Sequence, residues 1–119
     1  MHTVCELKSF ERAAYQAGMT ADEIDDLIDF LSFHPSAGET MEGTGGCRKL
    51  RFPGRGKGKS GGYRTITFYS GDEVPVFLVT VFSKGERSDL TKRERNDLAQ
   101  LAQRLKAEYR GRVVNPKTS

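Results

Sequence analysis

The chain of 119 residues has little of what many enzymes need: no tryptophan, two histidines and two cysteines. With only His2 and His34, no Ser–His–Asp or Cys–His arrangement for nucleophilic catalysis is credible. Cys5 and Cys47 fit no metal or redox spacing, and no carboxylates or Cys and His residues cluster as metal ligands. We therefore expect no metal and no cofactor. We interpret both cysteines as free thiols in a reducing cytosol, with one disulfide between them as the alternative.

Long hydrophobic runs are also missing. No apolar segment approaches the length that spans a membrane, and the N-terminus lacks the pattern of a signal peptide. A chain of 119 residues is by default a single domain with one modest core. We expect a cytoplasmic protein without a membrane partner, with one domain over residues 1–110 and a polar, frayed C-terminal tail over residues 111–119.

Acidic residues are missing from one stretch, between Thr44 and Gly71. Residues 1–43 carry nine acidic and two basic side chains, whereas residues 44–119 carry seven acidic and seventeen basic ones. Positive charge gathered in one segment repels itself, and a polyanion is the natural partner to relieve that repulsion. The segment therefore favours RNA or DNA as a ligand. Its cations are Arg48, Lys49, Arg51, Arg55, Lys57, Lys59 and Arg64.

Helical periodicity appears at both ends of the chain. A weakly alternating strand over residues 2–7 precedes a helix over 9–17. Thr20 and Glu23 form a capping box, so a second helix runs from Ala21 to about Phe33 and completes a helical hairpin. A second capping box, Thr91 with Glu94, begins a C-terminal helix.

Strand periodicity lies between these helices. Residues 47–52 and 62–69 alternate or are rich in β-branched and aromatic side chains, and residues 75–82 are apolar on both faces. Residues 36–46 are expected to form a loop and residues 53–61 a basic loop. The fold class is therefore α+β, with an antiparallel meander and the order β-α-α-β-β-β-α.

Several cations are placed by this pattern near one sheet face. Lys49 and Arg51 are two residues apart on a strand and so project from one face, about 7 Å apart. Arg64 begins the next strand, and Lys84 and Arg87 follow the last one. Such cations can bind a phosphodiester at several oxygens and stabilise charge on phosphorus during attack. The residues alone leave two interpretations open: a ribonuclease using 2′-OH attack, with a lysine as base, or an RNA-binding sheet without catalysis.

The strand that begins with Arg64 contains a conflict, because Arg64 shares its face with Ile66 and Phe68, which resemble core residues. Either the strand bulges after Arg64, or the basic face is partly apolar. The loop cations are expected to position phosphate rather than catalyse, and Tyr63 could stack on a base. The predicted RNA-binding residues are Arg48, Arg55, Lys57, Lys59, Tyr63 and Arg87.

Taken together, these segments resemble a known family. GTGGCRKLRFPGRGKGKSGGYRTITFY followed by VFLVTVFSKGERSDLT is similar to the RelE/ParE superfamily of type II toxin–antitoxin toxins, and within it to the HigB branch. The G-[ST]-G-G-x-R-K-[ILV]-R segment, the GKGK loop, the G-x-R strand start and the K-x-E-x-S-D-L-T segment carry the resemblance together. They span most of the chain.

The resemblance implies a RelE-like fold, with the helical hairpin on one sheet face and a basic concave face opposite. It implies a metal-independent, ribosome-dependent mRNA interferase, which enters the ribosomal A site and cuts the codon there. The cut proceeds by 2′-OH attack and leaves a 2′,3′-cyclic phosphate and a 5′-OH, which inhibits translation. The implied partners are the ribosome, mRNA and a cognate antitoxin, often one with a helix-turn-helix.

Carried over residue by residue, the resemblance assigns catalytic roles to four cations. Lys49 and Arg51 match two basic strand residues of the family, with Arg51 in place of a lysine. Arg64 matches the arginine that contacts the scissile phosphate, and Lys84 falls in the late basic segment. We hypothesise that Lys49 is the base, that Arg51 and Arg64 stabilise the phosphorane, and that Lys84 supports the leaving oxygen.

The chain also departs from the family. Some relatives have an arginine where this chain has Gly85 and a catalytic tyrosine or histidine near Thr91, which here is explained as a helix cap. No residue matches the general acid. Two other outcomes stay open: a ParE-like toxin that acts on DNA gyrase, and a non-catalytic module that binds RNA or only its antitoxin.

Overall fold

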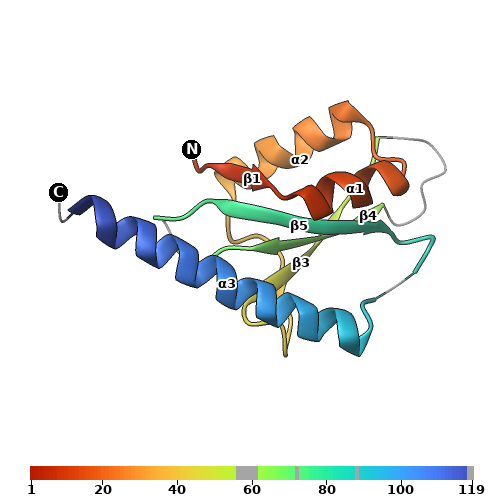
Figure 1. Ribbon diagram of the computed structural model, residues 1–119. Helices are drawn as coiled ribbons and strands as arrows, with labels where there is room; N and C mark the ends of the chain where they lie inside the picture. Colours follow the sequence, from red (N-terminus) through yellow and green to blue (C-terminus); the bar gives the residue numbers. More distant parts are fainter. Residues whose placement is uncertain (56–61, 72, 88, 118–119) are drawn as a thin grey trace.

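The computed structural model describes residues 1–55, 62–71, 73–87 and 89–117, with side chains as far as Tyr109. The fold is α+β, as predicted (Figure 1). No helix in these ranges is both long and apolar enough to cross a membrane. The elements are β1 (Val4–Glu6), α1 (Lys8–Gln16), α2 (Ala21–Phe33), β2 (Glu39–Thr40), β3 (Cys47–Phe52), β4 (Tyr63–Phe68), β5 (Val76–Ser83) and α3 (Lys92–Lys117).

One five-stranded sheet has the strand order β1-β5-β4-β3-β2. The pairs β2–β3, β3–β4 and β4–β5 are antiparallel, as the meander predicts. The remaining strand, β1, lies outside the meander and pairs parallel to β5. A parallel pair needs a long connection, and the hairpin and three strands that separate β1 from β5 provide it. The two-residue strand β2 lies inside the segment expected to be a loop.

The helical hairpin α1–α2 covers one face of the sheet (Figure 1). Phe10 of α1 and Leu27 of α2 are fully buried in the core on this side. The predicted capping box at the start of α2 is confirmed: the Glu23 N–H donates to Thr20 Oγ1 at 3.1 Å, and the Thr20 N–H donates to Glu23 Oε1 at 2.9 Å. The strands β3, β4 and β5 complete this core by contributing Leu50, Tyr63, Leu78 and Val81.

Helix α3 crosses the opposite face and forms a second core with it (Figure 1). Its first turn has the predicted capping box, because the Glu94 N–H donates to Thr91 Oγ1 and the Thr91 N–H donates to Glu94 Oε1. Leu98 and Ala102 pack on Ile66 and the neighbouring strand residues. The helix continues to Lys117, beyond the point where the sequence predicts a frayed tail.

This second core resolves the conflict on β4. Arg64, Ile66 and Phe68 do share one face, and the register irregularity between β4 and β5 falls after Ile66 rather than after Arg64. Helix α3 covers the end that carries Ile66 and Phe68. The face is therefore partly apolar, and its basic part lies at the Arg64 end.

Candidate active site

Strand pairing brings the predicted cations together. Arg51 on β3 lies directly opposite Arg64 on β4 in the antiparallel register. Lys49 is two residues from Arg51, so the pleat places both side chains on the face that carries Arg64. Like charges directly opposite each other destabilise a sheet. Proteins keep such unfavourable pairs mainly at functional sites, so the pair marks this face as a candidate site.

A backbone contact brings Lys84 to the same place. Its N–H donates to the carbonyl oxygen of Gly62 at 3.0 Å, just before β4 begins. Gly62 has a φ of 63°, and a Cβ there would lie 2.6 Å from the carbonyl oxygen of Phe52. Only glycine allows this close approach between the end of β3 and the start of β4. The end of β5 is thereby held beside the two arginines.

The four predicted catalytic cations line one cavity of about 320 Å³. Arg64 is nearly buried, at 6% exposed, whereas Arg51 and Lys84 are open to solvent. The fifth lining residue is Glu39, which faces Lys49 across the β2–β3 pair. Sequence reasoning missed Glu39 because a two-residue strand gives no periodic signal. Preorganised cations in such a cavity can bind a group that carries several negative charges.

Lys49 has a second anionic neighbour on the side of α3. Its Nζ lies 3.3 Å from Oδ1 of Asp89, which precedes the helix. Asp89 also accepts hydrogen bonds from Arg95 and from the N–H of Leu90. These interactions, led by the bond from the Leu90 N–H, hold the pKa of Asp89 below its usual value. Asp89 was also missed from the sequence, since it touches Lys49 only in the folded chain.

Tyr63 does not belong to this site, and its predicted stacking on a base is wrong. It alternates with Arg64 along β4 and so points to the opposite face, where it is fully buried under the helical hairpin. Its hydroxyl donates to Glu23 Oε1 at 2.9 Å. An aromatic ring with no exposed face cannot stack on a nucleotide in this structure.

Arg48 and Arg87, which were also predicted to bind RNA, lie outside the cavity and have partners within the protein. Arg48 points to the hairpin face, where its Nη1 donates to the carbonyl oxygen of Ser36 at 2.6 Å. Arg87 pairs with Glu94 at 2.8 Å and lies 4.7 Å from the centre of the Phe82 ring.

Arg55 is held against the acidic surface of α2. Its Nε and Nη2 donate to the two carboxylate oxygens of Asp26 at 2.6 and 2.8 Å, and these bonds raise the pKa of Arg55. Lys57 and Lys59, also predicted to bind RNA, lie outside the described residues.

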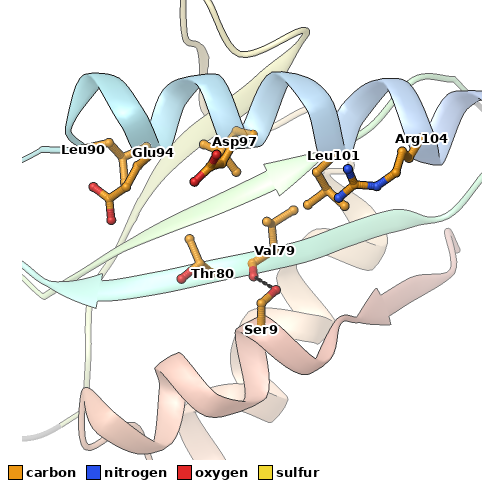
Figure 2. A pocket seen from close by; sticks show the side chains of 9 residues that line it. Ser9, Val79, Thr80, Leu90, Glu94, Asp97, Leu101 and Arg104 are labelled. Carbon is orange, nitrogen blue, oxygen red and sulfur yellow. Dashed lines mark hydrogen bonds between the residues drawn. The ribbon is translucent and has the colours of Figure 1, made fainter.

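A second hollow, of about 280 Å³, lies between α1 and α3 over β5 (Figure 2). Val79 and Leu101 give it an apolar lining, and the Ser9 hydroxyl donates to the carbonyl oxygen of Val79 at 2.6 Å. Asp97 and Arg104, of opposite charge, line it as well. Its apolar lining and its single cation set this hollow apart from the cavity that holds four cations.

The chain is thus a small α+β protein with a cationic cavity on one face of its sheet. A family described as the RelE toxin of the RelE / RelB toxin–antitoxin system matches residues 3–114, which is most of the chain. The chain belongs to this family. It is therefore a toxin of a toxin–antitoxin system, with an antitoxin as partner, and the resemblance seen in the sequence is confirmed. Its place in the HigB branch stays a prediction.

Proposed function

We propose that this toxin is a metal-independent endoribonuclease that cuts mRNA in the ribosomal A site. The observation that supports it most is the convergence of Lys49, Arg51, Arg64 and Lys84 on one cavity. The first three face one another across two strands, and a backbone hydrogen bond brings in the fourth. Rigid strands hold such groups more accurately than loops do, which suits stabilisation of a transition state.

The proposed reaction is attack of a ribose 2′-oxygen on the adjacent phosphorus. It forms the 2′,3′-cyclic phosphate and releases the 5′-oxygen of the next nucleotide. Arg51 and Arg64 contact the non-bridging oxygens, whose negative charge grows as the phosphorane forms. Guanidinium groups suit this role because they stay protonated and present paired donors to phosphate. Lys84 lies on the leaving side and donates a proton to the departing oxygen.

Two groups in the cavity can accept the 2′-OH proton. Lys49 is our first assignment; it is an ammonium group and must lose its own proton before it can act as the base. Glu39 is a carboxylate in the same cavity and accepts a proton directly. The variants Lys49→Met and Glu39→Gln separate the two roles. The cleavage rate of the wild type should fall at low pH as the base becomes protonated, and only the variant that lacks the base should lose this fall.

The decisive experiment is primer extension on an mRNA translated in a cell-free system with purified toxin. The wild type is expected to cut within codons, only when ribosomes translate the message, and to leave a 5′-OH. Arg64→Gln keeps a polar side chain of similar length and is expected to lower cutting at least about 100-fold with an unchanged circular dichroism spectrum. Arg12→Gln, on the exposed side of α1, is the matched control and should cut like the wild type. A folded Arg64→Gln variant that cuts normally contradicts the assignment.

The same preparation tests the alternatives. A ParE-like toxin would inhibit DNA supercoiling by purified gyrase and leave the mRNA uncut. A non-catalytic module would bind RNA with an affinity that falls steeply with salt, without any cleavage. Either result would replace the proposed nuclease activity.

A further inference from the structure

We infer that Asp89 is a positioning residue that holds the ammonium group of Lys49 at the cationic cavity, and that α3 holds Asp89 in turn through Arg95. The expected effect on cleavage rests on the proposed nuclease function, whereas the contacts between these residues do not. Asp89 itself does not line the cavity, so it acts on the substrate only through Lys49.

The contact between Asp89 and Lys49 links two distant parts of the chain. Lys49 is on β3, between β4 and the edge strand β2, and Asp89 lies in the segment that enters α3. A lysine side chain has four rotatable bonds and does not keep one direction without a partner. The carboxylate at 3.3 Å supplies that partner, and Lys49 is half-buried beside it. The ammonium is thus placed between Asp89 on one side and the cavity on the other.

Asp89 is itself fixed by three hydrogen bonds. The N–H of Leu90 donates to Oδ1 at 2.8 Å, and Nη2 of Arg95 reaches Oδ1 and Oδ2 at 3.3 and 3.2 Å. Arg95 also donates from Nη1 to the carbonyl oxygen of Glu42 at 3.3 Å, which ties α3 to the segment before β3. A carboxylate held in this way cannot swing into the cavity to replace the substrate phosphate, which favours a positioning role over competition.

The neighbouring residue keeps the segment in place. Leu90 is 9% exposed and packs with the α3 core, and Figure 2 shows it at the start of α3 over β5. In the first turn of α3, Glu94 completes the capping box and pairs with Arg87. The first turn of α3 is therefore anchored by apolar packing and by charge. The carboxylate of Asp89 connects this anchored segment to Lys49.

The contact is tested by labelling the lysine amines with a limiting amount of an N-hydroxysuccinimide ester and measuring the labelled peptides by mass spectrometry. Lys8, on α1, is the internal standard. Asp89→Asn keeps the size of the side chain and removes its charge, and is expected to raise the relative labelling rate of Lys49 at least about threefold, because the amine loses the carboxylate that holds it in place and becomes more accessible to the reagent. Asp89→Glu restores the charge and should return the rate toward that of the wild type. An unchanged rate in Asp89→Asn overturns the inference.

Two further variants complete the labelling experiment. Arg95→Met removes one hold on Asp89 and keeps both Asp89 and Lys49, so a smaller rise in Lys49 labelling is expected. If Asp89→Asn does not fold, this variant decides alone, and no rise in it overturns the inference. Asp97→Asn is the matched control. It removes a carboxylate of α3 that lines the second hollow (Figure 2). It should leave Lys49 labelling unchanged, and an equal rise there would refute a specific contact.

The consequence is tested by cleavage on programmed ribosomes. Asp89→Asn is expected to lower kcat at least about fivefold and to leave KM within about twofold, because Lys49 remains present but is less often placed for reaction. A wild type that does not cut refutes the proposed nuclease while labelling still decides the contact. A wild type that cuts, with an Asp89→Asn variant that labels faster but cuts equally well, refutes the positioning role alone.

Discussion

Replacing the buried carboxylate of Glu23 is expected to destabilise the protein far more than replacing the exposed carboxylate of Asp26, one turn further along α2. Glu23 is 2% exposed and accepts hydrogen bonds from the Thr20 N–H, the Tyr63 hydroxyl and the Arg55 N–H. It therefore joins the start of α2, the start of β4 and the chain leaving β3. Asp26 pairs with the exposed guanidinium of Arg55.

The magnitude follows from these contacts. Glu23→Ala leaves the fully buried Tyr63 hydroxyl without this acceptor, which costs about 1–3 kcal/mol. Loss of the reciprocal bond in the capping box adds about 1 kcal/mol. A total near 3 kcal/mol corresponds to a fall in Tm of roughly 10 °C for a domain of this size. Asp26→Ala should change Tm by far less, because solvent screens the exposed ion pair.

Thermal and urea unfolding followed by circular dichroism measure both variants. A double-mutant cycle isolates this contact: in the Glu23→Ala background, Tyr63→Phe removes a hydroxyl that has lost its Glu23 acceptor and should recover about 1 kcal/mol, whereas in the wild type it should cost a similar amount. The reasoning fails if Glu23→Ala is as stable as the wild type, or if Asp26→Ala is equally harmful.

Three other predictions concern charge and burial. Arg51→Gln should raise the free energy of unfolding by about 0.5 kcal/mol while it lowers cleavage, because it removes a like charge opposite Arg64; a less stable variant in urea unfolding would contradict this. Burial raises the pKa of Cys47 to about 11, so iodoacetamide should alkylate it at least about tenfold more slowly in the native protein than in urea at pH 8; equal rates would refute this. Because Asp89 and Glu94 have lowered pKa values when folded, they stabilise the fold above their unfolded pKa near 4 and lose this effect as pH falls through the folded pKa. Tm should therefore drop less between pH 6 and pH 3 in Asp89→Asn than in the wild type.

The local elements were predictable because their signals are local. A capping box places the start of α2 at Ala21 from four adjacent residues, and the structure has that start and the predicted end at Phe33. The strand Cys47–Phe52 follows from alternation alone and has the predicted bounds. Helix α3 was predicted to fray after residue 110, because a glycine and a polar composition weaken a helix locally, yet it continues to Lys117.

The site was predictable only in part. Period-two alternation places Lys49 and Arg51 on one face, and a hairpin brings Arg64 near them, so these three residues could be proposed from the sequence. The same alternation turns Tyr63 to the other face, but the sequence does not say which face is covered by helices. The partner that fixes Tyr63, Glu23, is forty residues away in the chain, and no local rule connects the two.

The amino-acid sequence alone determined the elements, the cationic strand residues and the family resemblance, because caps, periodicity and charge act between near neighbours. The tertiary structure decided which charges face one another. The β3–β4 register places Arg51 opposite Arg64, a backbone bond brings Lys84 beside them, and the folding of β2 and α3 against β3 adds Glu39 to the cavity and Asp89 to Lys49. These contacts join residues far apart in the chain, and only the burial of two cores on one sheet holds them in that register.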